Sequence, residues 1–113
     1  MAKLHVSPEA EDDLQEIKKY ITEEFDSLSA AINTLSKITK AFRRLTSFPD
    51  MGTPLSSIVD IQTNYRFIVC GNYLVFHRHE DGVVTVIRVI YGRRDYMKSL
   101  FGDTPESQPD TED

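Results

Sequence analysis

Apolar residues recur at helical spacing through the first half of the chain. Two runs, over residues 10–25 and 28–45, place an apolar residue at every third or fourth position, which gathers them on one side of a helix. Ser7-Pro8 predicts the start of the first helix, because serine caps free backbone N–H groups and proline fits the first turn. Asp26 and Ser27 separate the runs, and the loop SFPDMGTP ends the second. The pattern predicts two antiparallel helices, each with one apolar side.

The second half of the chain predicts a β-meander. Gly71-Asn72 and Asp81-Gly82 are two-residue hairpin turns between runs rich in β-branched and aromatic residues. We expect strands over residues 65–70, 73–80 and 83–91, with further strands over 55–61 and, at one edge, 3–6. The predicted fold class is α+β, with the N-terminal helix pair packed on one face of a small, mostly antiparallel β-sheet. The segment after Gly92 is consistent with a short C-terminal helix or a packed coil.

The two turns also predict which strand positions share a face, because side chains directly opposite one another point the same way. The expected pairs are 66 with 77, 67 with 76, 69 with 74, 77 with 86, 76 with 87, 75 with 88, and 74 with 89. One face is then wholly apolar and is expected to lie under the helices. The other face gathers Arg66, His77 and Arg88 and is expected to be the outer one.

Two arginines and a histidine on an open sheet face could bind an anion, since guanidinium groups fork onto phosphate or carboxylate. Arg93 and Arg94 follow the last strand and would add to this site. Two plainer interpretations stay open: the arginines cover the sheet and extend to water, and His77 is an ordinary sheet-face histidine instead of a general acid or base. His79 shares the face of His77, but two histidines without a third ligand predict no metal site.

Charge divides unevenly along the chain. The formal net charge of −5 splits into −3 over residues 1–64, +3 over 65–102 and −5 over 103–113. We expect a single domain over residues 1–102 and a disordered acidic tail over 103–113, which has no large apolar residue. The tail could be a solubilising extension, an expression artefact, or a decoy that competes with an anionic partner for the basic half of the chain. The lone Cys70, the absence of a leader and the absence of a long apolar segment predict a cytoplasmic protein with no membrane contact.

Several short motifs together resemble one family. They are SPEA opening the first helix, FP and Gly52 in the loop, YRF opening a strand, and RVIYGRRD closing the last strand. In this order and at these distances they resemble the RelE/ParE superfamily of toxins from bacterial type II toxin–antitoxin modules, over about residues 3–101. The resemblance implies a small toxin, without a cofactor, that is neutralised by a cognate antitoxin protein.

The superfamily implies two activities. RelE-like members cut mRNA at the ribosome without a metal, and ParE-like members inhibit DNA gyrase without catalysis of their own. For a nuclease, Arg66 matches a phosphate-contacting arginine and Arg94 a second basic position, while Arg88 and His77 complete the candidate catalytic set. Because LSSIVDI carries no Lys or Arg and the ending RVIYGRRD is more ParE-like, we favour a gyrase inhibitor.

A third possibility is a non-toxic module that keeps the fold and binds the antitoxin. In each case we expect no sequence-specific DNA binding by this chain alone. The expected partners are the antitoxin and either gyrase or the ribosome with its mRNA. The residues expected to form the partner-binding surface are Tyr73, His79, Arg93, Arg94 and Tyr96.

Overall fold

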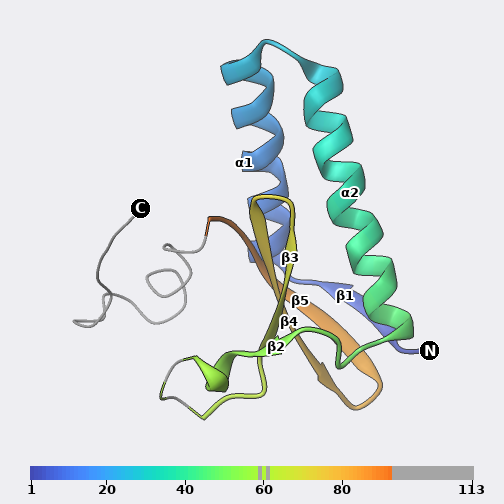
Figure 1. Cartoon of the computed structure of the whole chain (residues 1–113). Helices are drawn as coiled ribbons and strands as arrows, with labels where there is room; N and C mark the ends of the chain where they lie inside the picture. The colour runs from blue at the N-terminus through green and yellow to red at the C-terminus, as the bar shows by residue number, and fades with distance from the viewer. Residues whose placement is uncertain (59, 61, 93–113) are drawn as a thin grey trace.

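Two helices and a five-stranded sheet make up the part of the chain that the computed structural model describes, residues 1–58, 60 and 62–92. The expected α+β class, with the helix pair at the N-terminus, is confirmed (Figure 1). The segment expected to form a C-terminal helix or coil lies outside the described residues. The elements in chain order are β1 (Lys3–Val6), α1 (Pro8–Phe25), α2 (Leu28–Ser47), β2 (Thr53–Pro54), the 3₁₀ turn η1 (Leu55–Ser57), β3 (Arg66–Cys70), β4 (Tyr73–Glu80) and β5 (Val83–Tyr91).

Both helices begin at the residues that the sequence predicts. The Ser7 hydroxyl accepts a hydrogen bond from the Ala10 N–H at the start of α1, and the Ser27 hydroxyl accepts one from Ala30 at the start of α2. Asp26 ends α1 in the left-handed region, at φ 48°, which turns the chain back into the second helix. These local signals bring the two helices into an antiparallel pair.

The sheet has the strand order β1-β5-β4-β3-β2, with β1 parallel to β5 and the other neighbours antiparallel. The edge strand expected over residues 3–6 is confirmed. The strand expected over residues 55–61 is wrong, because the pairing residues are Thr53–Pro54 and the chain then enters the 3₁₀ turn Leu55–Ser57. Proline has no N–H to continue a ladder, and its fixed φ suits entry into a turn.

The predicted register is confirmed for one hairpin and only half confirmed for the other. All expected β3–β4 pairs are present, and His77 lies opposite Val86 as expected. Beyond that pair a β-bulge at Ile87 shifts β5 by one residue, so that Phe76, Val75 and Leu74 face Arg88, Val89 and Ile90. The expected pairs 76 with 87, 75 with 88 and 74 with 89 are therefore wrong.

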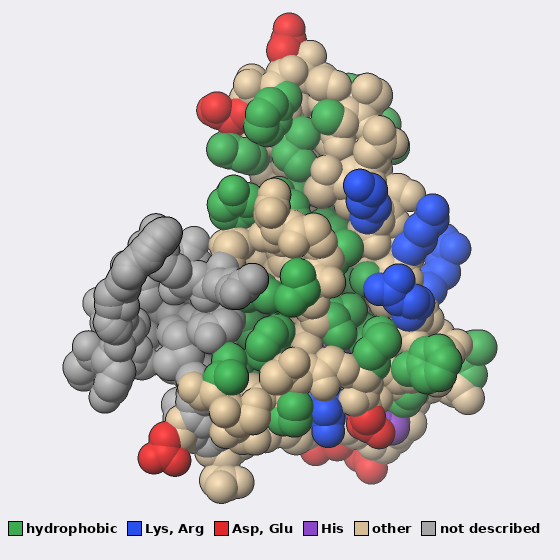
Figure 2. All heavy atoms as spheres, viewed as in Figure 1, with side chains coloured by type: hydrophobic (Ala, Val, Ile, Leu, Met, Phe, Trp, Pro, Cys, Tyr) green, Lys and Arg blue, Asp and Glu red, His purple; other side chains and the backbone are tan. Residues whose placement is uncertain are grey.

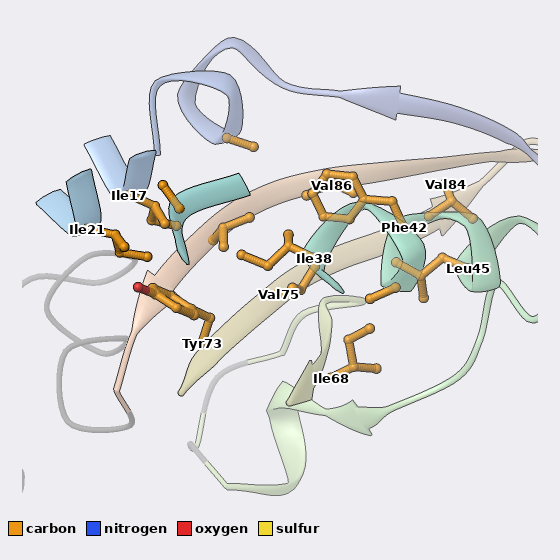
Figure 3. Close-up of a cluster of buried hydrophobic side chains, with 14 residues drawn as sticks. Ile17, Ile21, Ile38, Phe42, Leu45, Ile68, Tyr73, Val75, Val84 and Val86 are labelled. Atoms are coloured by element: carbon orange, nitrogen blue, oxygen red, sulfur yellow. The ribbon is translucent and has the colours of Figure 1, made fainter. Parts of the chain in front are cut away.

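The helices cover the face of the sheet that we expected to be the outer one. Buried side chains from both helices pack against residues of β3, β4 and β5 in one cluster (Figure 3), whose labelled sheet members are Ile68, Tyr73, Val75, Val84 and Val86. The row containing Phe67 and Phe76 instead packs with Leu55 in a second, smaller cluster. Both faces of these strands are mostly apolar, so the residue pattern did not distinguish the face that the helices cover.

The helix pair extends past the sheet, so the far part of its apolar stripe has none of the described strands beneath it (Figure 1). Phe25, Leu28 and Ile32 are each more than half exposed there. Figure 2 shows hydrophobic side chains on the surface of this part of the molecule, whereas Lys and Arg side chains gather further down, over α2. The sheet thus buries only the part of each helix that lies over it.

Candidate functional site

Arg66 and His77 lie opposite each other on β3 and β4, as predicted, but on the face that the helices cover. Arg66 is half-buried, and its Nη1 donates a hydrogen bond to the Gly52 carbonyl at 3.1 Å. Gly52 has φ +104°, and a Cβ there would lie 2.5 Å from the Phe67 carbonyl oxygen, so only glycine fits this approach. The loop after α2 is therefore held tightly against β3.

His77 is fully buried, which is unusual for a titratable side chain. Neither ring nitrogen has a hydrogen-bond partner among the described residues. Burial lowers the pKa of His77; Arg66 also lowers it, whereas the Met51 backbone and Asp50 act in the opposite direction. The imidazole is thus held neutral in a closed environment, not on an open face.

Arg88 is bound by a carboxylate of the first helix. Its Nε and Nη2 donate to the two oxygens of Asp13 at 2.8 and 2.9 Å, and the backbone N–H of Val89 donates to Asp13 at 2.8 Å. The Asp13 hydrogen bond raises the pKa of Arg88. The expected cluster of Arg66, His77 and Arg88 on one open face is therefore wrong: the bulge places Arg88 opposite Phe76, and Asp13 occupies its guanidinium.

Tyr73 and His79, both expected in the partner-binding surface, lie in separate parts of the structure. Tyr73 belongs to the core under α1 and is only 8% exposed, with its ring edge-on to Tyr91 at 5.5 Å between centroids. Burial raises the pKa of Tyr73, and Tyr91 and Tyr20 raise it further. His79 is half-buried, and its Nδ1 lies 3.2 Å from Asp50 Oδ1. The candidates Arg93, Arg94 and Tyr96 lie outside the described residues.

Sequence reasoning missed the groove between α1 and the end of β5. It has a volume of about 580 Å³ and is lined by Asp12, Asp13, Glu16, Ile17, Tyr20, Tyr73, Arg88, Val89, Ile90 and Tyr91. A sequence signal was available: three acidic residues, at positions 12, 13 and 16, follow one flank of the apolar stripe of α1. The β-bulge next to Arg88 has no such signal in the sequence.

The described residues contain no group of three or more His, Cys, Asp or Glu side chains that could hold a metal ion. Among the helices described, neither is long and apolar enough to cross a bilayer. The described residues present polar and apolar surface together in the groove between α1 and β5. They present exposed apolar side chains at the end of the helix pair that extends past the sheet.

Comparison with solved structures identifies the fold. The structure described as "Chromosomal ParDE TA system from P. aeruginosa" matches with a TM-score of 0.69 and 16% sequence identity, over 82% of this chain and 98% of that chain. No curated protein sequence gives a significant match. The class defined by the fold is thus a small α+β protein built like a chain of a toxin–antitoxin system.

The family follows from the sequence itself. Residues 4–96 match the family model described as "ParE toxin of type II toxin-antitoxin system, parDE". Because the match covers most of the chain, the chain belongs to the ParE toxin family, and the expected membership of the RelE/ParE superfamily on its ParE-like side is confirmed. Membership of a toxin–antitoxin family implies a cognate antitoxin as a partner.

Proposed function

We propose that this chain inhibits DNA gyrase in the cytoplasm and is neutralised by its cognate antitoxin. The observation that carries the proposal is the match of residues 4–96 to the ParE toxin family, since gyrase inhibition is the activity that a ParE-like resemblance implies. No catalytic step by the chain is required. Inhibition would come from a protein–protein contact made by the strand end, including Arg93 and Arg94.

The geometry of the candidate nuclease residues also supports a binding role. Cleavage of mRNA would need His77 within hydrogen-bonding reach of the proton that it moves, and Arg88 free to meet a phosphate. His77 is fully buried and Arg88 is bound to Asp13 in the structure. These positions favour gyrase inhibition over ribosome-dependent cleavage.

A supercoiling assay tests the proposal. Purified gyrase is incubated with relaxed plasmid and increasing amounts of the intact chain, and supercoiled product is measured on a gel. We expect supercoiling to be lost with the natural chain, and the Arg93→Ala/Arg94→Ala variant to need roughly tenfold more protein for the same inhibition. The matched control removes two adjacent exposed arginines of α2, Arg43 and Arg44, and should inhibit like the natural chain.

Normal supercoiling at saturating toxin would contradict the proposal. In that case primer extension on mRNA from translating ribosomes, with the natural chain and with Arg66→Ala, would test the nuclease directly. Cuts at defined codon positions that vanish in the variant would establish cleavage and assign Arg66 to it. If neither gyrase nor mRNA is affected, the chain is a non-toxic binding module of the family.

A further inference from the structure

A row of polar side chains follows α1 along the groove. Asp12, Glu16 and Tyr20 lie four residues apart, which places them one above another on a single flank of the helix. All three are exposed, and all three line the groove. Asp12 and Glu16 form no ion pair with any other residue that the structure describes. The groove therefore carries two carboxylates that are available to a cation.

The charge of the groove is not cancelled within it. Asp13 and Arg88 also line it, and they neutralise each other through hydrogen bonds of 2.8 and 2.9 Å. Three carboxylates against one guanidinium leave the described lining with a formal charge of −2. A ligand with two positive charges would balance this charge.

Aromatic rings from three elements meet in the same groove. They belong to Tyr20 of α1, Tyr73 of β4 and Tyr91 of β5. The ring centroids of Tyr73 and Tyr91 lie 5.5 Å apart, and Tyr20 and Tyr91 are 55% and 60% exposed. The face of an aromatic ring attracts ammonium groups, and several rings together form a cage for them. The tyrosines thus favour an organic cation as the ligand.

Tyr73 adds a hydroxyl group that lacks a partner. The residue is only 8% exposed, yet its phenolic oxygen makes no hydrogen bond to a described residue. Figure 3 shows this oxygen at the edge of the buried cluster, pointing away from Val75, and Tyr73 lines the groove. A buried tyrosine hydroxyl usually finds a hydrogen-bond partner. An ammonium group in the groove would donate the missing hydrogen bond.

The groove also has apolar lining. Ile17 and Val89, which are 8% and 3% exposed, contribute to it. Its volume of about 580 Å³ is in the range of sites that hold small organic molecules. Apolar lining favours a ligand with methylene groups, and the described residues contain no cluster that could hold a metal ion.

We propose that the groove binds a small organic dication, an alkyl chain that carries an ammonium group at each end. One ammonium group lies between the carboxylates of Asp12 and Glu16. The other lies against the rings of Tyr20 and Tyr91 and donates a hydrogen bond to the Tyr73 hydroxyl. The inference goes beyond the proposed function and does not depend on it.

A titration with small amines tests the proposal. 1,4-Diaminobutane is added to the intact chain at low salt, and binding is measured from amide chemical shifts in nuclear magnetic resonance spectra. We expect it to bind about tenfold more tightly than 1-aminobutane, which lacks the second ammonium group, with shifts concentrated at Glu16, Tyr20 and Tyr91. The neutral 1,4-butanediol should cause no shifts there. Mg²⁺, which has the same charge without an alkyl chain, should not displace the diamine at equal concentration.

Three variants supply matched comparisons. Glu16→Gln removes one carboxylate at nearly constant size and should weaken diamine binding about tenfold. Tyr73→Phe removes only the hydroxyl and should weaken it roughly fivefold. Glu11→Gln makes the same change as the first variant at an exposed position of α1 outside the groove, and should leave binding within about twofold. Preserved dispersion of the amide signals would show that each variant is folded.

Several outcomes would overturn the inference. Equal binding of the diamine and the monoamine, displacement by Mg²⁺, or equal losses in Glu16→Gln and Glu11→Gln would each mean that the amine responds only to overall negative charge. Shifts confined to residues 103–113 would assign binding to the acidic tail. An absence of shifts at the groove would also refute the site. Gyrase is absent from this titration, so its failure leaves the gyrase proposal untouched, and failure of the supercoiling assay leaves the groove untouched.

Discussion

The two halves of β5 lie in different surroundings although they form one strand. Residues 83–86 lie between β1 and β4, and Val84 and Val86 are fully buried under the helices. Residues 87–91 follow the β-bulge, lose β1 as a neighbour and meet side chains of Ser7 and Asp13 instead. The first half lies in the middle of the sheet, and the second half lines the groove beside α1.

Substitution in the first half of β5 should have the largest effect. Val86→Asp places a carboxylate at a fully buried position, which should cost about 4 kcal/mol or more of the free energy of unfolding. Tyr91→Asp makes a comparable change in the second half, where the side chain is 60% exposed, and should cost about 1 kcal/mol. Urea unfolding followed by circular dichroism compares them, and similar losses would refute the division of the strand.

Removal of the Asp13 carboxylate should have an intermediate effect. Asp13→Ala leaves the half-buried Arg88 guanidinium and the Val89 N–H without their acceptor, which should cost about 2 kcal/mol. Asp12→Ala, at the exposed neighbouring position, should change stability by less than about 0.5 kcal/mol. A double-mutant cycle with Arg88→Ala measures the coupling, and additive losses would show that the ion pair does not stabilise the second half of β5.

The buried imidazole opposite Val86 should make the stability of the first half depend on pH. The pKa of His77 in the folded state is lowered from 6.5, so the unfolded chain binds the proton more readily. The contribution of neutral His77 to stability is complete above about pH 6.5 and is lost as pH falls from there toward the lowered folded-state pKa. Urea unfolding at a series of pH values should show this decline.

Two variants separate this histidine from the other titrating groups. His77→Gln should remove the part of the decline that belongs to the buried ring, whereas His79→Gln, at a half-buried position beside Asp50, should keep it. The same decline below pH 6.5 in both variants would mean that another group carries the pH dependence.

Local sequence determined most of the elements. Ser7-Pro8 and Asp26-Ser27 determine the helix boundaries, because capping depends only on neighbouring residues. The two hairpin turns are equally local: one determines the β3–β4 register, and the other determines the first pairs of β4 and β5. The motifs spread over the chain were also enough to suggest the superfamily, which the match over residues 4–96 confirmed.

Tertiary structure decided the arrangement of the candidate site. Which face of a two-sided apolar sheet the helices cover depends on packing across the whole domain, so the burial of His77 could not be derived from alternation along β4. Next to the bulge at Ile87, the Arg88 guanidinium and the Val89 N–H are both bound by Asp13, which is 75 residues away from Arg88 in sequence. Local signals therefore determined most of the strands and turns of this protein, while contacts between distant residues determined which charged groups are buried or paired.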